Sequence, residues 1–264
     1  MGHGIFRDFV VEVDYRNSNI ILHNPEKYTP PSRYTAFDLD FSNNKPYINV
    51  ELGLGNGNTK IGKMLIDLGV SHALLLELNE RTGFDIPEKC IETSLGRGLS
   101  GDIDGYVARV ESVKIKDFVF HDVVTSYTAG YSKIRKRGRV GILGGGLLSR
   151  FNVIFDYSRS KLYLKPNKNF NDPFEYNMSG LELIAFGSGY DRIKVSGVIE
   201  GSPADIAGIE EGDEIVRVNW GNMRHYNLNR TSALMRTREG KKIRLKILRG
   251  NEKIKIVFRL KRMI

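Results

Sequence analysis

Asp67 is the acidic residue whose sequence context best fits catalysis. It lies in the segment KMLIDLGVSHALLL (residues 63–76), where an apolar run ends in this acid, Gly69 follows, and a second apolar run begins after Ser71. Glycine lets the backbone approach closely, so the N–H of Gly69 can point at the Asp67 carboxylate. Two interpretations stay open: Asp67 is a catalytic carboxylate, or it is an acid that merely ends a strand.

A second short motif favours the catalytic interpretation. Ile142, Leu143 and Gly144 form an apolar-apolar-glycine sequence, and a short predicted helix and the tripeptide FDY (residues 155–157) follow it. Together with Asp67, this motif resembles the retropepsin and pepsin superfamily of aspartic proteases over residues 34–170. In that superfamily, a strand ending in Asp-Thr/Ser-Gly lies beside a strand ending in apolar-apolar-Gly.

The resemblance implies a mechanism and the residues that perform it. Asp67 would supply one of two facing carboxylates that share a proton, because two like charges so close together cannot both ionise. One carboxylate would activate water while the other protonates the peptide carbonyl. Gly69 and Ser71 would belong to the same catalytic loop, and neither a metal nor a cofactor is expected.

The chain departs from the superfamily pattern at two points. Leu68 stands where the superfamily has Thr or Ser, whose hydroxyl ties the two catalytic loops together, and Val70 likewise offers no hydroxyl. The chain also holds a single Asp-x-Gly motif of this kind. The second carboxylate is therefore expected from a missing first lobe or, as the alternative, from Asp67 of a second subunit in a homodimer.

An internal repeat favours the first of these sources. Residues 2–22 (the first copy) align without a gap with residues 144–164 (the second copy). Each copy is predicted to form a glycine turn, a short helix and a two-stranded hairpin that turns near Asn17 or Arg159. The first copy is thus expected to be the end of a preceding lobe, and Asp14 and Asp156 are expected to be structural. The identical pairs are Gly2/Gly144, Gly4/Gly146, Phe9/Phe151, Val11/Val153, Asp14/Asp156, Tyr15/Tyr157, Ser18/Ser160 and Leu22/Leu164.

The glycine-bearing segment SLGRGLSGDIDGY (residues 94–106) precedes a long predicted strand. It occupies the place of the flap hairpin that covers substrate in the superfamily, so the resemblance assigns Gly98, Ser100 and Gly101 to a flap. Its G-x-G-x-x-G spacing does not indicate a dinucleotide site, because no strand-helix-strand unit follows. A P-loop at residues 57–64 is rejected because Met64 cannot bind magnesium and the segment leads into a strand.

The C-terminal part, residues 178–262, resembles PDZ domains of the bacterial, protease-associated kind. Within GSPADIAGIEEGDEI (residues 201–215), Ser202 is predicted to cap a short helix, Pro203 to lie in its first turn and Gly208 to end it. Such domains bind a peptide C-terminus by strand addition. The alternative is a PDZ fold retained for packing against the protease. The residues that the resemblance assigns to peptide binding are Gly180, Leu181, Glu182 and Leu183.

Composition excludes several other classes of protein. A content of 41% hydrophobic and 27% charged residues is typical of a soluble globular chain, and no apolar stretch is long enough to span a bilayer. The one cysteine, Cys90, excludes an internal disulfide and a multi-cysteine zinc site. Neither the G-x-S-x-G nor the H-E-x-x-H motif occurs. The N-terminus does not read as a secretory signal, although the resemblance favours the periplasm or cell envelope.

The net charge of +9 is concentrated at the C-terminal end. From Arg224 to Ile264 there are 14 basic and 2 acidic residues, and basic and apolar residues alternate in KKIRLKILR and KIKIVFRLK. Alternation with a period of two is typical of a half-buried strand with a solvated basic face. The alternative is a surface for an acidic partner or an anionic surface; nucleic acid is not the expected partner.

The sequence as a whole predicts a mainly β protein. Residues 1–30 are assigned to the remnant of a first protease lobe and a linker, residues 31–170 to a retropepsin-like β-barrel lobe, and residues 171–264 to a PDZ domain, a partly open barrel with two helices. The predicted function is an aspartic endopeptidase with a PDZ peptide-binding module. The competing hypothesis is a catalytically inactive scaffold that binds polypeptide C-termini through the PDZ domain.

Overall fold

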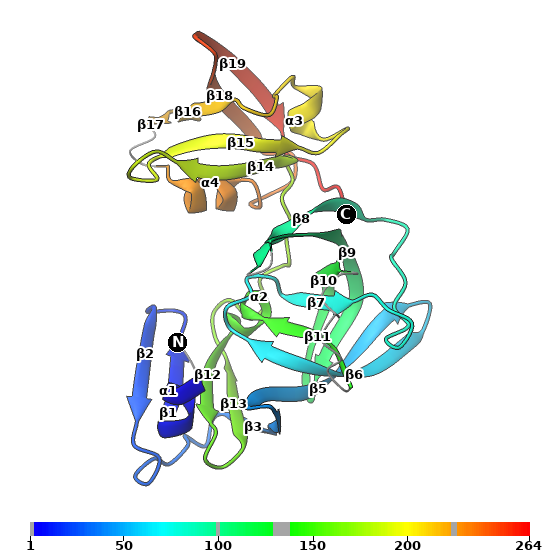
Figure 1. Ribbon diagram of the computed structural model, residues 1–264, viewed down its shortest axis with the longest axis vertical. Helices are drawn as coiled ribbons and strands as arrows, with labels where there is room; N and C mark the ends of the chain where they lie inside the picture. Colours follow the sequence, from blue (N-terminus) through cyan, green and yellow to red (C-terminus); the bar gives the residue numbers. More distant parts are fainter. Residues whose placement is uncertain (1–2, 99–100, 129–137, 223–225) are drawn as a thin grey trace. The chain divides into compact units, whose positions relative to one another are not determined.

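The computed structural model describes residues 3–98, 101–128, 138–222 and 226–264. The chain forms two compact units, Met1–Phe174 (unit 1) and Glu175–Ile264 (unit 2), and both are built mainly from β-strands (Figure 1). The predicted fold class is therefore confirmed. No helix among the described residues is both long and apolar enough to cross a membrane.

Unit 1 contains a large sheet that closes on itself. Its strand order is β4-β5-β6-β11-β7-β10-β9-β8, and an additional pairing of β5 with β9 turns the sheet into a barrel. The strands are β4 (Asp40–Ser42), β5 (Lys45–Gly55), β6 (Asn58–Asp67), β7 (Leu74–Glu77), β8 (Ile91–Gly98), β9 (Gly101–Ile115), β10 (Phe118–Thr128) and β11 (Arg139–Gly144).

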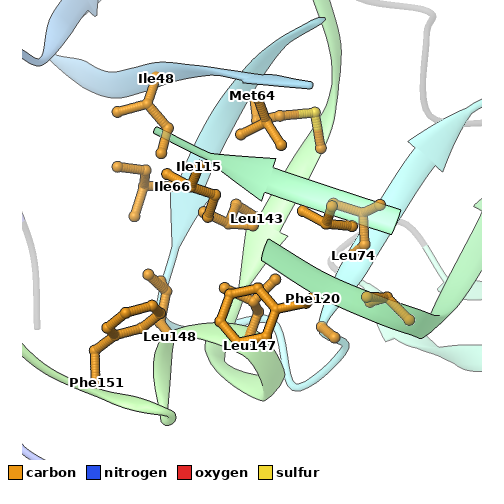
Figure 2. Packing of buried hydrophobic residues seen from close by; sticks show 14 of the residues in the cluster. Ile48, Met64, Ile66, Leu74, Ile115, Phe120, Leu143, Leu147, Leu148 and Phe151 are labelled. Carbon is orange, nitrogen blue, oxygen red and sulfur yellow. The ribbon is translucent and has the colours of Figure 1, made fainter. Parts of the chain in front are cut away.

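The core of unit 1 fills the barrel and continues under a short helix, α2 (Gly145–Leu148). Leu147 and Leu148 of α2 are fully buried, and Figure 2 shows them beside Leu143 and Phe151. The end of the second predicted motif, Gly144, thus connects a central barrel strand directly to a helix that closes the core.

A second sheet of unit 1 joins the two copies of the repeat. Its order is β2-β1-β12-β13-β3, and β1 of the first copy pairs antiparallel with β12 of the second. The predicted hairpins are present in both copies, and Ser18 and Ser160, at equivalent positions in their turns, both have positive φ (56° and 52°). The elements are α1 (His3–Asp8), β1 (Val10–Asp14), β2 (Asn19–His23), β3 (Thr35–Asp38), β12 (Phe151–Asp156) and β13 (Lys161–Pro166).

Unit 2 is a sheet of order β14-β15-β16-β18-β19, with β17 paired to β16, and two short helices. Ser202 caps α3 as predicted, since its side chain accepts a hydrogen bond from the N–H of Asp205, and Pro203 is the first residue of the helix. The elements are β14 (Leu181–Phe186), β15 (Arg192–Val198), α3 (Pro203–Ile206), β16 (Glu214–Val218), β17 (Gly221–Asn222), α4 (Leu228–Leu234), β18 (Lys242–Arg249) and β19 (Glu252–Arg259).

Candidate functional site

Asp67 is the last residue of β6, and the strand arrangement around it is unusual. β11 lies between β6 and β7, parallel to β6 and antiparallel to β7. In this register Gly144, at the end of β11, lies opposite Asp67. The loop of residues 68–73, which connects β6 to β7, must therefore pass the end of β11. The structure thus brings together the two motifs that the sequence singled out.

Glycines make this close passage possible. The backbone N–H of Gly145 donates to the carbonyl of Val70 (2.7 Å), and that of Gly146 donates to the carbonyl of His72 (3.2 Å). A Cβ atom at Gly144 would overlap the carbonyl oxygen of His72, and one at Gly146 would lie 2.7 Å from the backbone nitrogen of Ala73. The catalytic-loop candidate is therefore held by backbone contacts that exclude any larger residue at these positions.

The Asp67 carboxylate is partly exposed and faces a pocket of about 570 Å³. The backbone N–H of Gly69 donates to its Oδ1 atom (2.9 Å), which is the contact that the sequence predicted. Leu68 lies partly buried against the core, and Ser71 is exposed. Among the described residues, the Ser71 hydroxyl makes no hydrogen bond. Ser71 therefore belongs to the same loop as Asp67, but no hydrogen bond joins their side chains.

A second link joins the Asp67 loop to the candidate flap. β8 and β9 form a hairpin in which Gly98 lies opposite Gly101, whereas Ser100 lies outside the described residues. His72 Nε2 lies 2.9 Å from the carbonyl oxygen of Leu95 in β8, and Ser126 Oγ lies 2.8 Å from His72 Nδ1. Because a carbonyl can only accept, Nε2 carries the proton, and in the neutral ring Nδ1 then accepts from the serine hydroxyl. His72 therefore connects the hairpin to the loop that carries Asp67.

Both copies of the repeat also line the pocket. Phe6 and Tyr15 come from the first copy, and Phe155 and Tyr157 come from the second. Phe6 stacks on Tyr157 with ring centroids 5.4 Å apart, and burial raises the pKa of both Tyr15 and Tyr157 to about 12. The sequence analysis did not assign these rings to the site; the only signal for them was that Tyr15 and Tyr157 are identical across the repeat.

In unit 2, the segment assigned to peptide binding starts at a constrained turn. Gly180 has φ of 80°, and a Cβ atom there would overlap the side chain of Ser202. The N–H of Leu181 already donates to the Oγ atom of buried Ser179 (3.1 Å), so this N–H is not available to a ligand. Glu182 and Leu183 follow in β14, whose outer edge is unpaired among the described strands and which contacts α4.

Comparison with known proteins identifies the fold of unit 2. Residues 194–249 match the PDZ domain family. Unit 2 contains a PDZ domain. PDZ domains bind extended peptides by adding them as a strand to a sheet edge. In unit 2, β14 is an edge strand among the described strands and contacts α4.

The wider likenesses cover different shares of this chain and of the proteins compared. The chain is 26% identical over 129 residues to the carboxy-terminal processing protease CtpB of Bacillus subtilis, covering 49% of this chain and 27% of CtpB. It is similar to a retropepsin-like aspartic protease from Rickettsia conorii (18% identity, TM-score 0.36, 51% of this chain and 96% of that one). It is also similar to the HtrA-type protease AlgW with a decapeptide (15% identity, TM-score 0.34, 82% of this chain and 71% of that one). The chain spans about a quarter of CtpB.

No group of three or more His, Cys, Asp or Glu side chains among the described residues could hold a metal ion. Asp67 has no acidic or histidine partner within hydrogen-bond distance in the part of the chain that the structure describes. What the described residues offer at the site is one carboxylate, one backbone donor to it, and a mainly apolar pocket beside it.

Proposed function

We propose that unit 1 is one lobe of an aspartic endopeptidase and that Asp67 supplies one of its two catalytic carboxylates. The facing carboxylate would come from an equivalent lobe. One carboxylate, ionised, takes a proton from water, and the other, protonated, donates to the carbonyl oxygen of the peptide bond. The PDZ domain would hold a substrate or regulatory polypeptide by its C-terminus.

The observation that carries this proposal is the position of Asp67 in the strand arrangement β6-β11-β7. The carboxylate lies opposite Gly144, receives the N–H of Gly69 and faces the pocket of about 570 Å³. A simple strand-ending acid would need none of the close glycine contacts that fix the loop of residues 68–73. The rest of the site must then be completed from outside the described residues.

The pairing of the two repeat copies supports an equivalent lobe as the source of the second carboxylate. In the repeat, Val11 is equivalent to Val153, and Val13 is equivalent to Phe155. In the sheet the partners are exchanged: Val11 pairs with Phe155, and Val13 pairs with Val153. The two copies are thus related by a local two-fold axis. The same rotation would place a second barrel against the first copy, with its own loop facing Asp67.

Exposed apolar residues of the first copy also support this source. Ile20 and Leu22 are 51% and 45% exposed, whereas the equivalent Leu162 and Leu164 are fully buried against the barrel. An apolar face of this kind is expected to be covered by a partner. A lobe equivalent to residues 34–144 is the partner whose apolar surface matches, because the second copy already packs against one.

Leu68 favours the competing function, an inactive scaffold that binds peptides through the PDZ domain. It offers no hydroxyl that could tie two catalytic loops together, and its side chain lies against the core. From the resemblance to exported bacterial proteases we also predict that the whole protein lies in the periplasm or cell envelope.

The test is hydrolysis of casein at acidic to neutral pH. It compares this chain, the chain extended at its N-terminus by any upstream coding sequence, and the Asp67→Asn variant of each. Asp85→Asn is the control, because Asp85 is an exposed acid of the same unit and makes no hydrogen bond among the described residues. Activity that is lost only in Asp67→Asn supports the proposal. Unchanged activity in that variant, or no activity in any form, contradicts it and leaves the scaffold.

A further inference from the structure

The outer face of the β18-β19 hairpin in the PDZ domain is almost entirely basic. Ile243, Leu245 and Ile247 point into the core, so the alternate positions of β18 face outward, and the antiparallel register sets the outward positions of β19. All of these outward positions are Lys or Arg except Leu248 and Val257. We call this surface the basic face; its cations are Lys242, Arg244, Lys246, Lys253, Lys255 and Arg259.

Cations lie directly opposite one another across the strands. Lys246 pairs with Lys255 on one side and with Arg217 of β16 on the other. Lys242 likewise lies opposite Arg259. Like charges directly opposite on a sheet destabilise it. This arrangement therefore weakens the isolated domain, and an anionic partner would relieve the repulsion.

Acidic side chains do not neutralise the basic face. In the part of the chain that the structure describes, no ion pair joins Lys242, Lys246, Lys253 or Lys255 to a carboxylate. By contrast, Arg249 at the end of β18 binds Asp213 and Glu210, and Arg192 of β15 binds Glu214. One of these ion pairs borders the basic face, since Glu214 lies opposite Leu248, but neither pair includes the four lysines.

An exposed tryptophan borders the basic face. Trp220 is 81% exposed, and the guanidinium of Arg244 lies over its ring, 5.1 Å from the centroid. Val257, which lies opposite Arg244, is 50% exposed. Tryptophan, exposed aliphatic side chains and lysine or arginine together are characteristic of surfaces that lie at the headgroup level of a bilayer.

We infer that the basic face binds the surface of an anionic lipid bilayer. Lys and Arg would contact the lipid phosphates, and Trp220 would enter the headgroup layer. A nucleic-acid surface fits less well, because single-stranded binding uses a row of aromatic platforms and this face has one ring, at its edge. β14 lies at the opposite end of the sheet from β19, so lipid binding leaves the peptide-binding edge free.

Trp220 also supplies the test, because it is the only tryptophan in the chain. The full chain is titrated with vesicles of phosphatidylcholine alone and of phosphatidylcholine mixed with phosphatidylserine, and tryptophan emission and cosedimentation are followed. We expect a blue shift and binding with the mixed vesicles only, and a steep loss of binding as salt is added.

The decisive variant is Lys246→Gln/Lys255→Gln, which should lower binding to the mixed vesicles roughly tenfold or more, given the usual contribution of each cation. The control is Lys27→Gln/Lys89→Gln, which removes the same charge from exposed positions of unit 1 and should leave binding unchanged. Circular dichroism checks that both variants fold. Equal binding to neutral vesicles, or equal loss in both variants, overturns the inference. So does binding to a fluorescent oligonucleotide or to polyglutamate without binding to vesicles.

Discussion

Glu12 and Ile154 occupy the same place in the two copies of the repeat, and they lie directly opposite each other on the antiparallel strands β1 and β12. A residue that pairs with its own equivalent marks a local two-fold axis. The axis passes beside the pocket at Asp67, since the equivalent residues Tyr15 and Tyr157 both line that pocket. The repeat therefore does more than extend a sheet: it defines where an equivalent lobe would lie.

Leu22 and Leu164 give a matched test of this symmetry. Leu164→Ala should lower the free energy of unfolding of unit 1 by about 2–5 kcal/mol, because Leu164 is fully buried. Leu22→Ala should change it by less than about 0.5 kcal/mol, because Leu22 is 45% exposed. Urea unfolding followed by circular dichroism measures both. A large cost for Leu22→Ala in a chain extended at its N-terminus, but not in this chain, would indicate that a further lobe covers the first copy.

Gly146 and Gly4, another equivalent pair, test the close contacts of the Asp67 loop. Gly146→Ala places a Cβ atom 2.7 Å from the nitrogen of Ala73. We therefore expect the free energy of unfolding of unit 1 to fall by roughly 1–3 kcal/mol and amide exchange in residues 68–73 to become faster. Gly4→Ala meets no atom within 4 Å and should be tolerated. Similar effects of the two substitutions would mean that α2 can move away from the loop, and the rigid positioning of Asp67 would have to be abandoned.

The sequence predicted best those features that depend on local patterns. Asp67 and Gly144 were singled out because short motifs at strand ends are visible in the chain, and the caps of α3 follow directly from Ser202 and Pro203. Contacts between distant segments were not visible. Nothing near Leu95 in the sequence indicates that its carbonyl accepts a hydrogen bond from His72. Glu77 likewise looks like a surface acid in the sequence, and only the position of β7 in the sheet shows that it is buried. These contacts depend on the strand order, which local patterns do not specify.

Asp213 makes the stability of the PDZ domain depend on pH in the acid range. Burial by itself would raise the pKa of Asp213, but the hydrogen bonds from Arg249 and from the N–H of Glu210 outweigh it and hold the pKa below its usual value. A lowered pKa stabilises the folded state above the unfolded value of about 4, and this stabilisation is lost as the pH falls through the folded pKa. The protection of amides in β16 and β18 of the full chain, measured relative to their intrinsic exchange rates at each pH, should therefore fall below about pH 4.

Arg249→Met isolates this contribution. It should lower the free energy of unfolding of the PDZ domain by about 2 kcal/mol near neutral pH, because it leaves the Asp213 carboxylate buried and without its cation. It should also make the stability of the domain depend less on pH in the acid range. Arg192→Met is the control: its ion pair with Glu214 is formed by an exposed arginine and is screened by solvent, so this variant should lower the stability much less than Arg249→Met does. An unchanged pH profile in Arg249→Met would show that other groups cause the acid sensitivity.

Glu77 and Arg139 form a buried ion pair at the end of the β7-β11 pairing opposite the Asp67 loop. Their side chains are 4% and 7% exposed, so neither charge can be solvated once its partner is removed. Glu77→Leu should therefore destabilise unit 1 by about 3–5 kcal/mol, and Arg139→Met should cost a similar amount. The double variant should lie within about 1–2 kcal/mol of the parent, because two apolar side chains leave no isolated charge.

Amide exchange in the double variant separates two possible roles of the ion pair. If it is purely local, the double variant keeps the amide protection of residues 68–73 and the Gly69–Asp67 hydrogen bond that accompanies it. If the ion pair also fixes the register of β11 against β7, the double variant regains stability but exchanges faster at Gly144 and Gly145, because β11 can then shift along its neighbours. Additive costs in the two single variants would contradict both roles, since they would mean that Glu77 and Arg139 do not depend on each other.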